Sequence, residues 1–130
     1  MKHEDLAYTL TTDKPCDAVV EALEKKSPEN QFRVLHVHNV QQTLAEKGFQ
    51  RGPLKIIEVC NAGFAHKALA QDVLVALFMP CKFSVWTEGS KTHVSLGRPS
   101  MISAMLPQAK LESLANDVET TLKRVMQESV

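Results

Sequence analysis

The chain has 130 residues, of which 44% are hydrophobic and 23% are charged, and 15 Lys and Arg balance 15 Asp and Glu. This length is typical of one domain, and the composition excludes intrinsic disorder, which requires few apolar residues and a large net charge. Zero net charge argues against binding to nucleic acids or anionic membranes, because both depend on positive charge. The longest apolar run, residues 73–80, is too short to span a membrane.

The cysteine content and the charged start of the chain indicate a reducing environment. Cys16, Cys60 and Cys81 are too few for a small secreted protein held together by disulfides. The first residues are charged and lack the apolar stretch of a secretory signal. We therefore expect a single domain over residues 1–130, located in the cytoplasm.

The first half of the chain alternates predicted strands with predicted helices. Residues 5–10 read as a short strand, and a helix with apolar residues at helical spacing begins at residues 12–13. β-Branched and aromatic residues predict a second strand over residues 32–37. Asn39 has the character of a helix N-cap, and Gly48 is a natural stop for the short helix that follows.

The middle of the chain predicts a third strand, another helix and a hairpin. Residues 54–60 form the strand, and Asn61 caps the helix after it. Residues 73–79 are apolar but fit neither periodicity, so we expect a loop that packs against the core. Residues 81–87 and 91–96 form the two arms of a hairpin with a glycine in its turn.

The last predicted helix covers residues 107–127 and is opened by Pro107. It carries an apolar stripe on one face and charged residues on the other, as expected for a helix that lies on a sheet. Together the elements predict an α+β fold, a single two-layer domain with helices on a mainly antiparallel sheet, in the order βαβαβαββα. The stripe is Leu111, Leu114, Val118, Leu122 and Val125, and the charged face is Glu112, Asp117, Glu119, Lys123 and Arg124.

The candidate chemistry lies at two predicted strand ends. Glu58 and Cys60 share a strand face, and Cys60 directly precedes a helix start, which favours a thiolate. Cys81 begins the following strand, so antiparallel pairing would bring it to the same sheet edge as Cys60. These residues are the candidate catalytic groups: Cys60 as nucleophile, Cys81 as resolving thiol and Glu58 as proton acceptor. Cys16, on an apolar helical stripe, reads as packing.

Two other interpretations stay open. Free cysteines are most often buried and act as small hydrophobes, so the pair could be packing in a non-catalytic dimeric binding module. Two thiolates are also half of a tetrahedral zinc site, which His66, His93 or a second copy of the chain could complete. No phosphate-binding glycine loop or serine-nucleophile motif occurs, and the sequence does not decide whether the protein is an enzyme.

Residues 56–61, I-I-E-V-C-N, followed by residues 79–81, M-P-C, and a valine-bearing strand with a glycine turn, resemble the family called domain of unknown function 302. The resemblance covers about residues 32–100 and departs at Ala62 and Met79, where the family commonly has proline and leucine. It implies a curved antiparallel sheet with helices packed on it and, often, a homodimer, but no activity. The residues that it marks are Cys60 and Cys81, with Glu58 and Asn61 beside them.

The resulting expectation is a thiol site in which Cys60 and Cys81 bind or relay a small molecule, a sulfur species, haem or a metal ion. Asn61, His66 and His93 are the candidate ligand-binding residues around it. The apolar segment 73–79 is too long to stay in water, so either the last helix or a second copy of the chain must cover it. The resemblance favours the second copy, and thus a symmetric homodimer.

Overall fold

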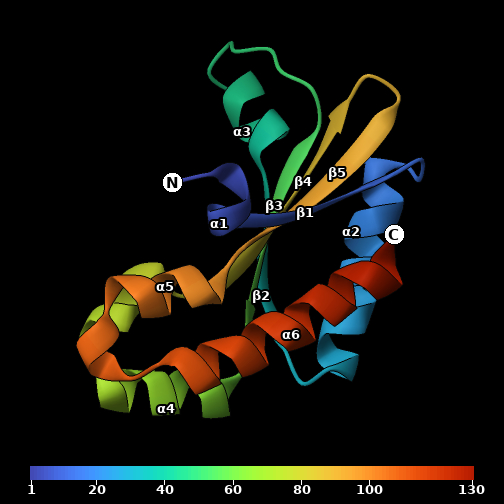
Figure 1. Ribbon diagram of the computed structural model, residues 1–130. Coiled ribbons are helices and arrows are strands. Elements are labelled where there is room, and N and C mark those ends of the chain that lie inside the picture. Colours follow the sequence, from blue (N-terminus) through green and yellow to red (C-terminus); the bar gives the residue numbers. More distant parts are fainter.

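The computed structural model describes residues 1–130 and contains a five-stranded antiparallel sheet with helices on one face (Figure 1). The strand order is β1-β5-β4-β3-β2, so the first strand of the chain lies beside the last. The β4–β5 hairpin therefore occupies the interior of the sheet, and β1 and β2 form its edges. The strands are β1 (Ala7–Thr12), β2 (Arg33–Asn39), β3 (Leu54–Cys60), β4 (Cys81–Glu88) and β5 (Lys91–Gly97).

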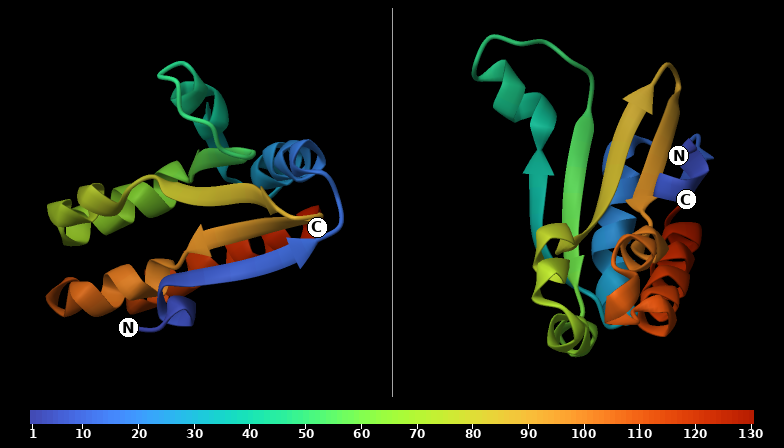
Figure 2. Two further views of the ribbon diagram at one scale, coloured as in Figure 1. Left: turned by 90° about the horizontal axis from the view of Figure 1, so that it is seen from above. Right: turned by 60° about the vertical axis from the view of Figure 1, so that its left-hand side comes forward.

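The two longest helices, α2 (Cys16–Glu29) and α6 (Glu112–Ser129), pack on the same face of the sheet (Figure 2). The shorter helices α4 (Ala62–Gln71) and α5 (Pro99–Met105) gather with the start of α6 at one end of the molecule (Figure 1). None of the helices is long and apolar enough to cross a membrane. The remaining elements are α1 (His3–Leu6) and α3 (Val40–Ala45), with the 3₁₀ turns η1 (Val73–Phe78) and η2 (Pro107–Ala109).

The apolar residues form two buried clusters. Alternate residues of the central strands face α2 and α6, and with them they make the main core, which contains Ile57, Phe83 and Leu122. A smaller satellite cluster of Val75, Ala109 and Leu111 joins η1, η2 and the start of α6. The satellite cluster lies at the end of the molecule where the short helices gather, beyond the ends of the strands.

The structure confirms the predicted α+β class, the antiparallel sheet and the order of the main elements. The third strand ends at Cys60 as predicted, and the hairpin turn places Gly89 at a φ of +63°, where glycine is favoured. The N-cap of α3 is also confirmed, because the Asn39 side chain accepts a hydrogen bond from the Gln42 amide at 3.1 Å. These features depend on local signals, which the sequence carries in full.

Three of the local predictions were wrong, and two short helices, α1 and α5, were not predicted. Residues 73–79 contain a 3₁₀ helix instead of a loop on the core, and most of its apolar side chains are exposed. The last helix starts at Glu112 instead of Pro107, because Lys110 adopts a left-handed conformation with a φ of +54°. Glu119 is buried, although its position in the pattern assigned it to the charged face.

Candidate functional site

Cys60 and Cys81 lie on neighbouring strand ends. In the β3–β4 register, Val59 is paired with Cys81, and Cys60 is the next residue after Val59. Both cysteines are partly exposed free thiols, and both line one cavity at this end of the sheet. Cys16 lies elsewhere, in the main core, where its Sγ is 3.9 Å from the carbonyl oxygen of Val85. The three cysteines thus divide into two in the cavity and one in the core.

The cavity is small and mostly apolar. It has a volume of about 90 Å³ and lies between the main core and the satellite cluster. An apolar cavity of roughly 150 Å³ holds benzene, so this one admits only a ligand of a few atoms without rearrangement. Its walls come from the strand ends and from α4, η1, α5 and α6, and include Phe32, Phe64, Val75, Ile102 and Val118.

The polar side chains around the cavity are already hydrogen-bonded. Asn61 caps α4 by accepting a bond from the Phe64 amide at 3.0 Å, and it donates to the carbonyl of Gln31 at 2.9 Å. Ser103 donates to the carbonyl of Ser100 at 2.7 Å. Asn61 is a predicted ligand-binding residue, but both the oxygen and the nitrogen of its side-chain amide are hydrogen-bonded to the backbone. The sulfur atoms of the lining residues remain available for a ligand.

The two cavity thiols influence one another electrostatically. Burial raises the pKa of the Cys81 thiol to about 11, and the negative charge of a Cys60 thiolate adds to this increase. Cys81 is therefore protonated at neutral pH, and the pair does not readily carry two negative charges. A protonated Cys81 suits a resolving thiol or a second ligand better than a primary nucleophile. The pKa of Cys16 is also raised, first by burial and then by the charge of Asp17.

Glu58 lies on the outer face of the sheet, which faces away from α2 and α6. Its Oε1 is 3.4 Å from the Nε2 of His38 on β2, and its cross-strand neighbour on β4 is Lys82. Glu58 does not line the cavity, whereas Cys60 does. The prediction that Glu58 and Cys60 share a face rests on the alternation of side chains along β3. Cys60 is the last residue of that strand, where the chain turns into α4, so it lines the cavity and Glu58 does not.

The two candidate histidines lie away from the thiols. His66 is exposed on α4. His93 lies on β5, where its ring stacks on Trp86 with centroids 5.3 Å apart and its Nδ1 is 3.0 Å from Thr11 Oγ1. Neither histidine lines the cavity, and no group of three or more His, Cys, Asp and Glu side chains is arranged to hold a metal ion. Within one chain, the structure offers no tetrahedral zinc site of the kind considered from the sequence.

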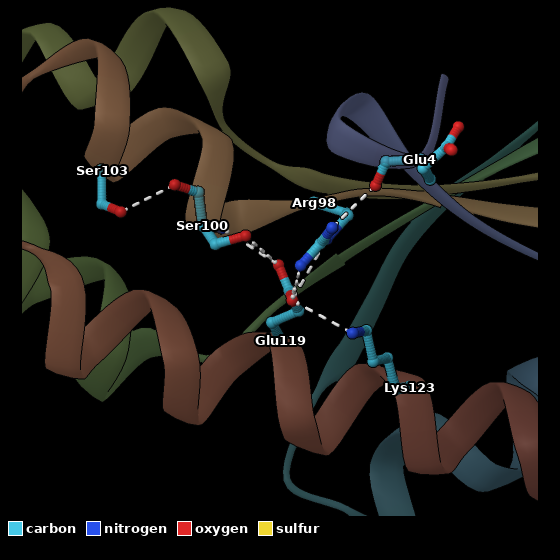
Figure 3. A network of polar contacts seen from close by, with 6 residues as sticks. All are labelled: Glu4, Arg98, Ser100, Ser103, Glu119 and Lys123. Atoms are coloured by element: carbon cyan, nitrogen blue, oxygen red, sulfur yellow. Dashed lines mark hydrogen bonds and ion pairs between the residues drawn. The ribbon is translucent and has the colours of Figure 1, made fainter. Parts of the chain in front are cut away.

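A buried polar network that was not predicted from the sequence lies beside the cavity (Figure 3). Glu119 accepts hydrogen bonds from Ser100 N at 3.1 Å, from Ser100 Oγ at 2.7 Å and from Arg98 Nη2 at 3.1 Å, and Lys123 Nζ lies 3.2 Å away. Burial would raise the pKa of Glu119, but the bonds from Ser100, Arg98 and Lys123 outweigh it and lower the pKa to about 2. The network ties α5, one wall of the cavity, to α6.

Only the Lys123 partner of Glu119 was visible as a sequence pattern, because it lies one helical turn away. Arg98 and Ser100 come from another element, and nothing local to Glu119 signals them. Met79 was missed for a different reason. It lines the cavity beside the two cysteines, but a methionine in an apolar run has no feature that separates it from ordinary packing.

Comparison with known proteins agrees with the fold. The family model described as domain of unknown function DUF302 matches residues 8–129, a longer segment than the residues 32–100 expected from the motifs. A solved structure, the crystal structure of an uncharacterized conserved protein DUF302 from Bacillus stearothermophilus, is 30% identical in sequence and superposes with a TM-score of 0.91, covering 96% of this chain and 98% of that one. No curated protein matches the sequence. The chain therefore belongs to the DUF302 family.

Proposed function

We propose that the protein binds or relays a small, soft ligand through Cys60 and Cys81, in the apolar cavity at the end of the sheet. One observation carries the proposal: Cys60 and Cys81, on neighbouring strand ends, line the same cavity, whereas Cys16 is buried in the main core. A cysteine that serves only as packing does not need to border a cavity, whereas the donor atoms of a binding site must border the space that the ligand fills. The division among the three cysteines therefore favours a site.

The cavity also limits the class of ligand. Asn61 and Ser103 are occupied by bonds within the chain, so a strongly polar ligand would lose its hydrogen bonds to water without replacement. The volume of about 90 Å³ disfavours haem, which is many times larger. A small sulfur species, a soft metal ion or a compact thiophilic molecule fits both the size and the apolar walls.

The two thiols have different roles in this proposal. The first bond to the ligand is assigned to Cys60, at the end of β3, because burial raises the pKa of Cys81 to about 11 and keeps its thiol protonated at neutral pH. Cys81 follows as the second ligand or the resolving thiol. Glu58 has no part in this step, since it does not line the cavity.

The test uses methylarsonous acid, CH3As(OH)2, which is smaller than benzene and reacts with two neighbouring thiols to form two arsenic–sulfur bonds and release two water molecules. We expect native mass spectrometry to show one methylarsenic group on the reduced full chain and on Cys16→Ser. We expect none on Cys60→Ser or Cys81→Ser, with thermal melts to verify that each variant is folded. Failure of the unmodified chain to take up the reagent would contradict the proposal, as would uptake by either cavity variant.

A non-catalytic dimeric binding module is the second candidate, with the cysteines as packing. The exposure of Val73, Leu74 and Leu77 favours it, because such apolar patches mark interfaces. The arsenical distinguishes the two candidates. Packed cysteines would not react with it in the folded chain, and a thiol site would.

A further inference from the structure

We propose that the ligand of the cavity is a monovalent soft metal ion, copper(I), held by the sulfur atoms of Cys60, Met79 and Cys81. This inference rests on the proposed thiol site and identifies its ligand. All three sulfur-bearing side chains line the same small cavity. Met79 is two residues before Cys81, and it packs against the satellite cluster on the side of the cavity away from the main core.

The donor set determines which metals fit. Thiol and thioether sulfur favour soft ions such as copper(I), whereas magnesium and calcium require several oxygen ligands. Zinc takes four ligands, commonly from cysteine and histidine, and no histidine lines the cavity. Copper(I) accepts two or three ligands, and three sulfur atoms are what the cavity offers.

The apolar walls oppose a pair of bare thiolates, and a bound cation offsets their charge. Copper(I) between two thiolates leaves one negative charge in the cavity in place of two, and an uncompensated charge there is costly. The binding step is balanced: the Cys60 and Cys81 thiols each lose a proton to solvent, two sulfur–copper bonds form, and no electron is transferred. The Met79 thioether carries no proton and joins as a neutral ligand.

The test is an anaerobic titration of the reduced full chain with copper(I), in competition with a chromophoric copper(I) chelator. We expect one copper ion per chain in the unmodified protein and in Cys16→Ser, and loss of binding in Cys60→Ser. Met79→Leu keeps the volume and the apolar character of the wall but removes the thioether. It should weaken copper binding by about tenfold or more, in line with the loss of one ligand contact.

The outcomes distinguish a failure of the copper site from a failure of the thiol site on which it rests. Met79→Leu should still take up methylarsonous acid, because both thiols remain. Arsenical uptake without copper binding would overturn the copper site and leave the thiol site standing. Equal copper affinity of the unmodified chain and Met79→Leu would overturn the three-sulfur site. Loss of both arsenical and copper binding in the unmodified chain would overturn the proposed function as well.

Discussion

At the scale of single residues, the pKa of Cys81 depends on the charge of Cys60. Burial raises its pKa to about 11, and a thiolate at Cys60 contributes to that increase. In Cys60→Ser this negative charge is absent, so the pKa of Cys81 should fall and its alkylation should begin at lower pH. Rates of iodoacetamide labelling, followed by peptide mass spectrometry across the alkaline range, measure the change. Cys16→Ser is the control, and an unchanged Cys81 profile in Cys60→Ser would show that the two thiols do not interact.

Glu119 makes a second prediction at this scale. Its pKa of about 2 in the folded chain lies below the ordinary value of 4.5, so ionised Glu119 stabilises the fold above pH 4.5. That contribution is lost as the pH falls from 4.5 towards 2, and the shift corresponds to at most about 3 kcal/mol. Glu119→Gln should therefore lower the free energy of unfolding at neutral pH and flatten its dependence on acid pH, measured by urea denaturation.

The matched control for that experiment is Glu112→Gln, an exposed position on the same helix. It should change the free energy of unfolding by less than about 0.5 kcal/mol. If Glu119→Gln behaved like Glu112→Gln, the buried network would contribute nothing to stability.

At the scale of elements, the start of α4 depends on the two ends of the Asn61 side chain. Asn61→Ala removes both the cap on Phe64 N and the bond to Gln31 O, and should cost about 1–2 kcal/mol of stability. Asn61→Asp keeps the capping oxygen and loses only the donor, so it should fall between Ala and the unmodified chain. Chemical denaturation of the three proteins measures this order. If Asp were as destabilising as Ala, the cap itself would not matter.

The elements that the sequence predicted are those with local signals. Period-two alternation fixed the β4–β5 hairpin, and asparagine caps marked the starts of α3 and α4. The missed helix α5 has a weaker local signal, Pro99 at its first position, and no side-chain cap. Its first turn is held by Glu119, whose carboxylate accepts from Ser100 N across from another helix. A contact between distant segments cannot be read from either segment alone.

In the candidate site, too, some of the features that depend on contacts between distant segments were not predicted. Strand order predicted that Cys60 and Cys81 would lie at one sheet edge, and the register brings Cys81 opposite the residue before Cys60. The sequence could not predict that Glu58 lies outside the cavity, because that depends on where β3 ends and α4 begins. Nor could it assign Met79 to the cavity, because the fold of η1 determines its position.

At the scale of the whole molecule, the predicted homodimer has a candidate surface. The side chains of Val73 and Leu77 are 71% and 76% exposed on η1, and Met105 of α5 is 51% exposed. Leu77→Asp should dissociate a dimer that buries this surface, and sedimentation velocity measures the change in mass. Leu77 is a better probe than Phe78, which lines the cavity and is half-buried. An unmodified chain that sediments as a monomer at micromolar concentration would contradict the prediction.

The division of the interior into two unequal clusters affects how long a molecule stays bound in the cavity. The main core contains 15 buried residues and the satellite cluster contains 3, so separating the short helices from the sheet exposes far less apolar surface than unfolding the chain. Regions with few buried contacts open locally, at a lower free energy than global unfolding. Because the cavity lies along the boundary between the clusters, local opening of this kind exposes it to solvent. The dissociation rate of any bound molecule is then limited by how often the short helices separate from the sheet.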